Sequence, residues 1–126
     1  MKIPFGFAGR FGSFKHAVDG IFTMMKSEHN ARVHGLATVA VCMAGIYWRI
    51  GRNEWCWVAA AIVAVWVAEA LNTAFEFLAD ATSPDFHPLV GKAKDVAAGA
   101  VLITALGSVL IGLLVFGPYA VKMLGW

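Results

Sequence analysis

Three long apolar stretches dominate the hydrophobic pattern of the chain. No residue from 96 to 121 is charged, every residue from 55 to 68 is apolar, and residues 35–48 contain neither charge nor histidine. Each stretch is able to anchor a transmembrane helix of about 20 residues. The predicted transmembrane helices cover residues 32–50, 54–80 and 94–116.

The first predicted span is short, and polar side chains stand at its ends. Arg32, His34 and Arg49 lie inside or beside it. Polar side chains in such positions extend along the helix until their charged ends reach the membrane surface. We therefore expect all three side chains to point toward the interfaces.

Residues 9–28 show a helical pattern of a different kind. Apolar side chains recur there at alternating steps of three and four residues, while basic and polar residues occupy the other faces. This pattern is typical of an amphipathic helix that lies flat on a membrane surface. Packing of the same face against other helices is the alternative, and one face can serve both purposes. The apolar positions are Phe11, Phe14, Val18, Ile21 and Met25.

The composition indicates that these helices lie in lipid. The chain has 126 residues, of which 60% are hydrophobic and only 14% are charged. A soluble domain of this size exposes a large fraction of its atoms and could not hide so much apolar surface. We therefore predict a single all-α integral membrane domain over residues 1–126, with an N-terminal interfacial helix and three transmembrane helices.

The ten basic residues are distributed unevenly between the two sides of this domain. Seven lie before the first span or between the second and third, and three lie on the opposite side. Basic residues accumulate on the cytoplasmic side, so we predict a multi-pass protein of the cell inner (plasma) membrane with a cytoplasmic N-terminus. The net charge of +2 is too small to suggest a nucleic-acid partner. The seven are Lys2, Arg10, Lys15, Lys26, Arg32, Lys92 and Lys94, and the three are Arg49, Arg52 and Lys122.

The second predicted span carries four polar residues on one stripe. Their spacing of three, four and four residues places all of them on the same face of an α-helix. An ionised carboxylate near the bilayer centre costs about 3 kcal/mol on insertion scales, so these side chains are expected to face a wet cavity or a cation. A polar seam that joins helices is the alternative. The four are Glu69, Asn72, Glu76 and Asp80.

Two further groups lie at the same cytoplasmic boundary. Glu28 ends the interfacial helix at the level of Glu76 and Asp80. Two carboxylates there suit Mg²⁺, which takes one or two protein carboxylates together with phosphate oxygens. Lys92 and Lys94 begin the third span, where a bound phosphate would relieve their conflict with the helix dipole. Taken singly, Glu28 also fits a solvated surface residue, and the lysines also fit a simple topology signal.

Together these groups are suited to phosphoryl transfer, which needs mainly positioning and neutralisation of charge. The chain contains no Walker A motif and no protein-kinase glycine loop. The residues by themselves therefore predict a membrane site for a metal and an anion, and no narrower function.

The motifs within the spans are more specific when they are taken together. Residues 69–76 are Glu-Ala-Leu-Asn-Thr-Ala-Phe-Glu, Asp80 follows, and residues 92–95 are Lys-Ala-Lys-Asp. This combination resembles the prokaryotic diacylglycerol kinase and undecaprenol kinase family. The resemblance extends over residues 9–118.

The chain is similar above all to the Gram-positive, undecaprenol-type branch of this family. Two positions depart from that branch, which usually has a basic residue where Gly12 stands and a lysine where Gly91 stands. The stretch around Gly91 resembles the diacylglycerol branch instead. The resemblance thus favours undecaprenol as the acceptor, with diacylglycerol as the alternative. The segments that match the undecaprenol branch are residues 9–17, 28–34, 54–55 and 87–89.

This resemblance implies an ATP- and Mg²⁺-dependent kinase that phosphorylates a lipid alcohol, with composite sites between the protomers of a homotrimer. It implies that Glu69 is the catalytic base that contacts the acceptor hydroxyl, and that Glu28 and Glu76 are Mg²⁺ ligands on the ATP. The implied nucleotide contacts, besides Glu28 and Glu76, are Asn72, Lys94 and Asp95, with Arg10, Asp80, Asp85, Phe86 and His87 as further contributors.

Two other classes of function stay open at this point. A small proton-coupled transporter could use Glu69 as a proton relay, although three spans and a mixed acidic and basic cytoplasmic cluster argue against it. A non-catalytic membrane scaffold would tolerate Glu76→Ala and Lys94→Ala without loss of function.

Overall fold

The computed structural model describes the backbone of residues 7–126 and the side chains from Gly9 onward. Lys2, one of the seven basic residues counted above, lies outside the described residues. The described chain folds into four α-helices, which confirms the predicted all-α class. The helices are α1 (Phe7–Ser27), α2 (His29–Tyr47), α3 (Arg52–Thr82) and α4 (Pro88–Met123).

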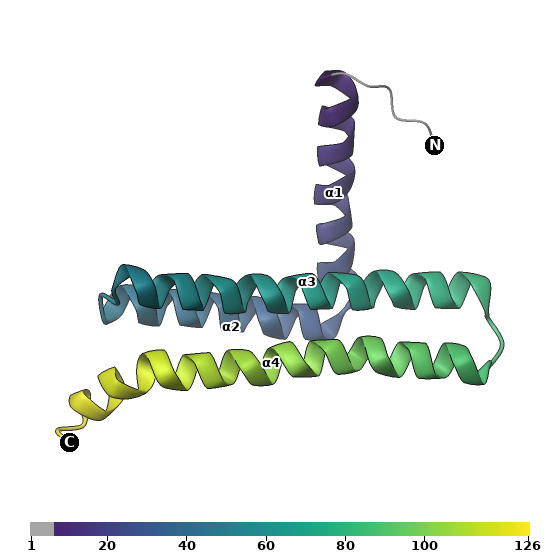
Figure 1. Ribbon diagram of the computed structural model, residues 1–126. Helices are drawn as coiled ribbons and strands as arrows, with labels where there is room; N and C mark the ends of the chain where they lie inside the picture. Colours follow the sequence, from purple (N-terminus) through teal and green to yellow (C-terminus); the bar gives the residue numbers. More distant parts are fainter. Residues whose placement is uncertain (1–6) are drawn as a thin grey trace.

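Helices α2, α3 and α4 run alongside one another, and α1 projects sideways from them (Figure 1). The C-terminal half of α1 lies against α3, where the two helices line a shared cleft between Ala70 and Phe77. Beyond this crossing, α3 and α4 continue together to their connection. An amphipathic helix that projects sideways from a helical bundle has the geometry expected of an interfacial helix.

The junction between α1 and α2 is set by Glu28 and Arg32. Glu28 has an extended backbone, with φ −114° and ψ 119°, which ends one helix and starts the next. The Arg32 guanidinium donates hydrogen bonds to the carbonyl oxygens of Met25, at 3.2 Å, and Lys26, at 2.9 Å. These contacts pair carbonyl groups that the end of α1 leaves without helical partners. The charged end of Arg32 therefore ties the two helices together.

The turn between α2 and α3 falls at residues 48–51, slightly before residues 51–53, which separate the first two predicted spans. Arg49 adopts a positive φ of 51° there, and Gly51 provides the extended residue before α3. In the last turns of α2, before this connection, Gly45 is buried against Trp55 of α3. The close approach of the two helices depends on the missing side chain at residue 45.

We expect Gly45→Ala to destabilise the fold. A Cβ atom at residue 45 would lie 2.6 Å from Cη2 and 2.7 Å from Cζ2 of Trp55. Overpacking of this kind costs about 1–3 kcal/mol. Unfolding in mixed micelles measures the loss. Gly12→Ala on α1, where nothing lies within 4 Å of the added atom, is the matched control, and equal stability of the two variants would contradict the prediction.

Helices α3 and α4 form the most extensive pair in the fold. Polar contacts hold them at three levels: Lys94 Nζ with Asp80 Oδ1 at 3.1 Å, Ser108 Oγ with the Ala61 carbonyl at 3.3 Å, and the Tyr119 hydroxyl with Glu54 Oε1 at 2.9 Å. The buried apolar cluster lies near the Tyr119 end. Its buried members are Ile50, Val58 and Val115.

Two predicted helix ends were wrong, and in both cases a proline lies inside a helix. The predicted spans 54–80 and 94–116 left a connection of thirteen residues between them, but the connection covers only residues 83–87, and Pro88 begins α4. The first helical position suits proline because its missing N–H has no partner there. The His87 side chain caps this end by accepting from the Leu89 amide at 3.2 Å.

The second wrong end was at Gly117-Pro118, where α4 was expected to stop. The helix passes through Pro118 and continues to Met123. A proline removes one bond from the helical ladder, but helices in lipid tolerate this loss when the neighbouring bonds stay closed.

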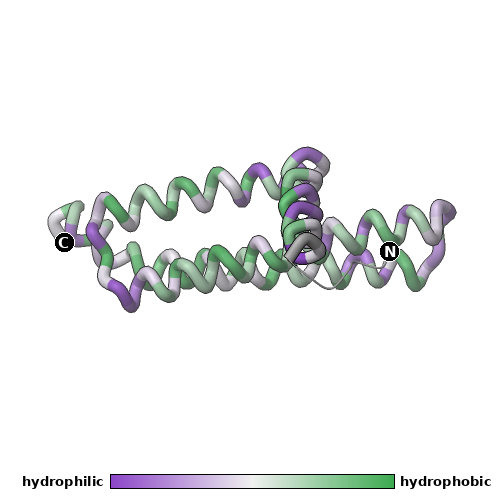
Figure 2. Tube along the Cα trace, turned by 90° about the horizontal axis from the view of Figure 1, so that it is seen from above, coloured by the Kyte–Doolittle hydropathy of each residue, from purple (hydrophilic) through white to green (hydrophobic). Residues whose placement is uncertain are grey.

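Much of the apolar surface of the chain is exposed. Helices α3 and α4 are each long and apolar enough to cross a membrane, and 39% of the apolar window of α3 is buried against only 6% for α4. Figure 2 shows hydrophobic residues along the middle of the bundle and polar residues at its turns and along α1. An exposed face of this extent needs lipid or another protein chain to cover it.

Candidate active site

Glu69 lies on α3 and is the centre of the candidate site. Its side chain is 0% exposed, and neither carboxylate oxygen has a hydrogen-bond partner within the described residues. The nearest basic group is His34 on α2, whose Nε2 lies 3.4 Å from Glu69 Oε2. A buried carboxylate without a hydrogen-bond donor is unfavourable for folding. Such a group is typical of a functional site rather than of a structural seam.

Asn72 follows Glu69 by one turn and is also buried. Its Oδ1 atom lacks a hydrogen-bond partner in the described part of the chain. The side chain lines two clefts: one between α3 and α4 that includes Thr104, and one between α2 and α4 that includes Asn30 and His34. Asn72 is therefore open to a ligand from either side of α4.

Glu28 and Glu76 come together although they lie on different elements. A hydrogen bond to Glu76, together with partial burial and the negative charges of Glu76 and Glu69, raises the pKa of Glu28 from its ordinary 4.5 to about 7. Two neighbouring carboxylates concentrate negative charge that a cation would neutralise.

This carboxylate pair fits Mg²⁺ better than a metal held by protein ligands alone. Residues 7–126 contain no cluster of three or more histidine, cysteine or acidic side chains able to hold a metal ion. Mg²⁺ commonly takes one or two carboxylates and completes its shell with phosphate oxygens and water. The donor set of Glu28 and Glu76 matches that requirement.

We expect the stability of the ligand-free protein to fall as the pH rises from about 4.5 to about 7, through the titration of Glu28. The raised pKa means that the folded protein binds the proton more tightly than the unfolded chain, so this contribution is complete below pH 4.5 and is lost as the pH passes 7. Thermal unfolding in micelles without Mg²⁺ measures it. The comparison is between wild type and Glu28→Gln at each pH, and parallel curves would contradict the prediction.

Lys94 lies at the start of α4 and contacts Asp80 on α3. The ion pair has an N–O separation of 3.1 Å, and the two side chains are 40% and 72% exposed. A pair this open contributes less than about 1 kcal/mol to stability. Breaking this ion pair therefore costs little stability when Lys94 turns toward the phosphates of a bound nucleotide.

The remaining predicted site residues lie apart from Glu69 within one chain. Arg10 is exposed on α1, and Asp95 is exposed on α4. The exposed residues Asp85, Phe86 and His87 form the connection between α3 and α4, beyond the crossing of α1 (Figure 1). Their roles in binding stay predictions.

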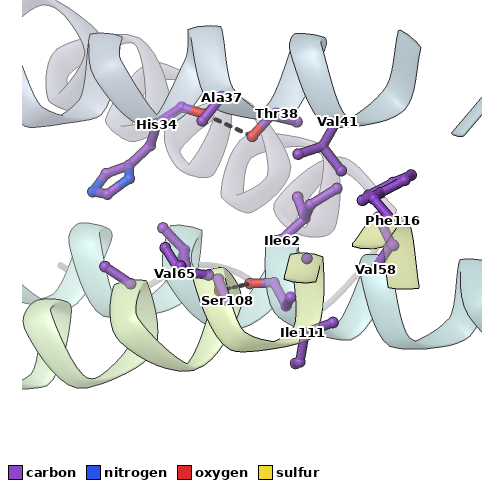
Figure 3. A pocket seen from close by; sticks show the side chains of 14 residues that line it. His34, Ala37, Thr38, Val41, Val58, Ile62, Val65, Ser108, Ile111 and Phe116 are labelled. Atoms are coloured by element: carbon purple, nitrogen blue, oxygen red, sulfur yellow. Dashed lines mark hydrogen bonds between the residues drawn. The ribbon is translucent and has the colours of Figure 1, made fainter. Parts of the chain in front are cut away.

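The position predicted for the His34 side chain was wrong. It was expected to reach the membrane interface, but its ring turns inward and contacts Glu69. Figure 3 shows the ring projecting from α2 at one end of a cavity between α2, α3 and α4. The sequence contained one weak signal of this position, because His34 is a titratable residue inside a predicted span.

The family model described as prokaryotic diacylglycerol kinase matches residues 15–116. The chain belongs to this family. It is therefore a lipid kinase, as the motifs predicted. Membership implies a nucleotide-dependent reaction, a lipid substrate and association with membranes, in agreement with the two helices that are able to span a bilayer.

Two relatives show how the chain compares with individual members. It is 40% identical over 108 residues to the undecaprenol kinase of Bacillus subtilis, a match that covers 86% of this chain and 88% of the relative. It is 35% identical over 101 residues to the diacylglycerol kinase of Synechocystis sp., which covers 79% of this chain and 58% of the relative. The first match thus spans most of both proteins, whereas the second leaves a large part of the relative unaligned.

Proposed function

We propose that this lipid kinase transfers the γ-phosphate of ATP, in the presence of Mg²⁺, to undecaprenol at the cytoplasmic face of the inner membrane. Diacylglycerol is the alternative acceptor. The observation that carries the proposal is the fully buried Glu69 carboxylate, which lacks a hydrogen-bond partner within residues 9–126. It lies on the same stripe of α3 as Glu76, which contacts Glu28.

The lengths of the helices support a site at the membrane boundary. Helices α3 and α4 have 31 and 36 residues, or about 46 and 54 Å at 1.5 Å per residue, against a hydrocarbon core of about 30 Å. Their excess length belongs in water. With α1 flat on the cytoplasmic surface, the boundary crosses α3 between Ala70 and Phe77. Glu69 then lies just inside the lipid, and Glu76 lies just outside.

This placement suits a reaction in which a hydrophobic lipid acceptor and a charged nucleotide donor meet at the membrane boundary. The three spans are α2, α3 and α4, and α2, with 19 residues, is about 28 Å long. The hydrocarbon tail of the acceptor stays in lipid while its hydroxyl reaches Glu69. The nucleotide stays in water beside Glu28, Glu76 and Lys94.

The reaction at this site is one in-line transfer. Glu69 accepts the proton of the lipid hydroxyl, and the hydroxyl oxygen forms a bond to the γ-phosphorus. The bond from that phosphorus to the bridging oxygen breaks, and ADP leaves with the electron pair. Glu28 and Glu76 would hold Mg²⁺, which would supply positive charge to neutralise the phosphate oxygens. Lys94 orients those oxygens, and Asn72 contacts the nucleotide from the clefts that it lines.

The wide exposed face of α4 supports a homotrimer. Only 6% of its apolar window is buried in one chain, and the clefts beside Asn72 open on both sides of α4. A neighbouring protomer that covers this face would bring its own residues to the site. Arg10, Asp80, Asp95 and the connection at residues 85–87 are the nucleotide contacts that such an arrangement would complete.

The decisive experiment compares the two acceptors directly. Purified protein in micelles is given Mg²⁺ and radiolabelled ATP with either undecaprenol or diacylglycerol. Faster labelling of undecaprenol is expected because the Bacillus subtilis undecaprenol kinase is similar to this chain over most of both proteins. Faster labelling of diacylglycerol would reverse the choice of acceptor. Absence of labelling on either lipid, with folded protein, would overturn the proposal.

A further inference from the structure

The Glu69 carboxylate has one basic neighbour within the described residues, and this neighbour has no role in the mechanism above. His34 Nε2 lies 3.4 Å from Glu69 Oε2, and its side chain is 17% exposed. The separation is longer than an ideal charge-assisted hydrogen bond of about 2.8 Å. Contacts at catalytic groups often tighten only when substrate binds.

A second contact between α2 and α3 lies one helical turn from His34. Trp66 Nε1 donates to Thr38 Oγ1 at 3.0 Å, and Thr38 Oγ1 in turn donates to the His34 carbonyl at 2.7 Å. The Trp66 and His34 rings are also neighbours in an edge-to-face arrangement, with centroids 6.4 Å apart and planes at 69°. Thr38 follows His34 by one turn of α2, and Glu69 follows Trp66 by about one turn of α3. The two pairs are therefore neighbouring links between the same helices.

His34 also stands at the border between polar and apolar surroundings. On one side it ends a cavity of about 290 Å³ whose lining is mainly apolar, with Val41, Ile62 and Val65 among its walls (Figure 3). On another side it lines the cleft that contains Asn72. Besides Glu69, the polar side chains that line these two spaces with His34 are Thr38, Ser108, Asn30 and Asn72. Within this set, the carboxylate is the natural acceptor for an imidazole N–H.

We propose that His34 is a positioning residue for the phosphoryl transfer. Its Nε2–H donates to Glu69 Oε2, and this contact fixes the carboxylate so that Oε1 stays free to accept the proton of the lipid hydroxyl. The Thr38–Trp66 link fixes α2 against α3 at this level, which keeps the ring opposite Glu69. The inference rests on the proposed role of Glu69 as the base. Without His34, the carboxylate would turn between orientations, and fewer of them would face the hydroxyl.

The test compares two replacements of His34 in the full-length protein in micelles. His34→Phe keeps the ring but removes the donor, and it is expected to lower kcat for the lipid by about 10- to 100-fold while the KM for ATP stays within about twofold. His34→Gln supplies an amide N–H and is expected to recover part of that loss. His16→Phe, at an exposed position on α1, is the control for a histidine-to-phenylalanine change and should keep the wild-type rate.

A purely structural role for His34 would give a different result. It would lower the unfolding temperature and weaken ATP and acceptor together, and Gln would be no better than Phe. Either that pattern or a wild-type kcat in His34→Phe would overturn the inference. If His34→Phe does not fold, the kcat of folded His34→Gln decides: a moderate loss at unchanged KM for ATP supports the inference, and a wild-type or absent rate overturns it.

Glu69→Gln, measured beside these variants, separates this inference from the function on which it rests. If Glu69→Gln is inactive while His34→Phe keeps the wild-type rate, only the positioning role of His34 fails. If Glu69→Gln keeps the wild-type rate, the proposed base fails, and the role of His34 fails with it.

Discussion

Glu69→Gln is expected to lower kcat by about 100- to 10,000-fold, the range in which general bases contribute to catalysis. The amide has nearly the shape of the carboxylate but cannot accept the proton of the lipid hydroxyl. Binding of Mg²⁺ and ATP should persist, because the residues proposed to hold them, Glu28, Glu76 and Lys94, are unchanged. Lipid labelling gives the rate, and a fluorescent ATP analogue gives the nucleotide affinity.

The matched control for this variant is Glu54→Gln, at the opposite end of the same helix. Glu54 accepts a hydrogen bond from the Tyr119 hydroxyl at 2.9 Å, and the carbonyl of glutamine is able to keep that bond. We expect Glu54→Gln to retain the wild-type rate. Were Glu69→Gln to match it in turnover, Glu69 would not be the base. Were Glu69→Gln also to lose nucleotide binding, its effect would not be specific to the chemical step.

Glu76→Gln is expected to raise the Mg²⁺ concentration needed for half-maximal activity by about 10- to 100-fold. The substitution removes one of the two carboxylates proposed to hold the ion. Contacts of this kind with a charged group are worth about 1.5–3 kcal/mol, which corresponds to that range of affinity. Rates measured over a titration of Mg²⁺ at saturating ATP report the change, and high Mg²⁺ should recover much of the activity.

The Glu28 partner provides an internal check on this prediction. Because Glu28 and Glu76 contact each other, Glu28→Gln should produce a shift in Mg²⁺ dependence of the same direction. A shift in Glu76→Gln but not in Glu28→Gln would leave Glu76 alone as the ligand. An unchanged Mg²⁺ dependence in both variants would remove the metal site from this pair, and Asp80 would then be the next carboxylate to test.

The spacing of four polar residues predicted that they share one face of α3, but it did not predict how deeply each one is buried. Glu69 and Asn72 are buried, Glu76 is half-buried and Asp80 is exposed, although all four share one helical face. Spacing sets the direction in which a side chain points from its helix axis. The burial of that side chain depends on which other helices pack against it. At the level of Asp80, α1 and α2 no longer cover α3 (Figure 1).

The position of the His34 side chain was predicted wrongly from the sequence. A histidine near the start of a predicted span reads naturally as a group that extends to the membrane surface. Its actual position is set by Thr38 and Trp66, which bind α2 to α3 at one axial level. That level places the His34 ring opposite Glu69. Residues 34 and 69 are far apart in sequence, and no local pattern relates them.

The sequence by itself determined that the chain is helical and membrane-associated, and its motifs identified the lipid kinase family and the acidic residues on α3. These properties follow from apolar length, periodicity and residue type, which are local. The sequence also placed Glu28 at the level of Glu76, but only the tertiary structure decided that Lys94 meets Asp80 and that His34 meets Glu69. Such pairs depend on the axial register and rotation of packed helices, which arise from contacts at positions such as Gly45 and Trp55 rather than from any single stretch of sequence.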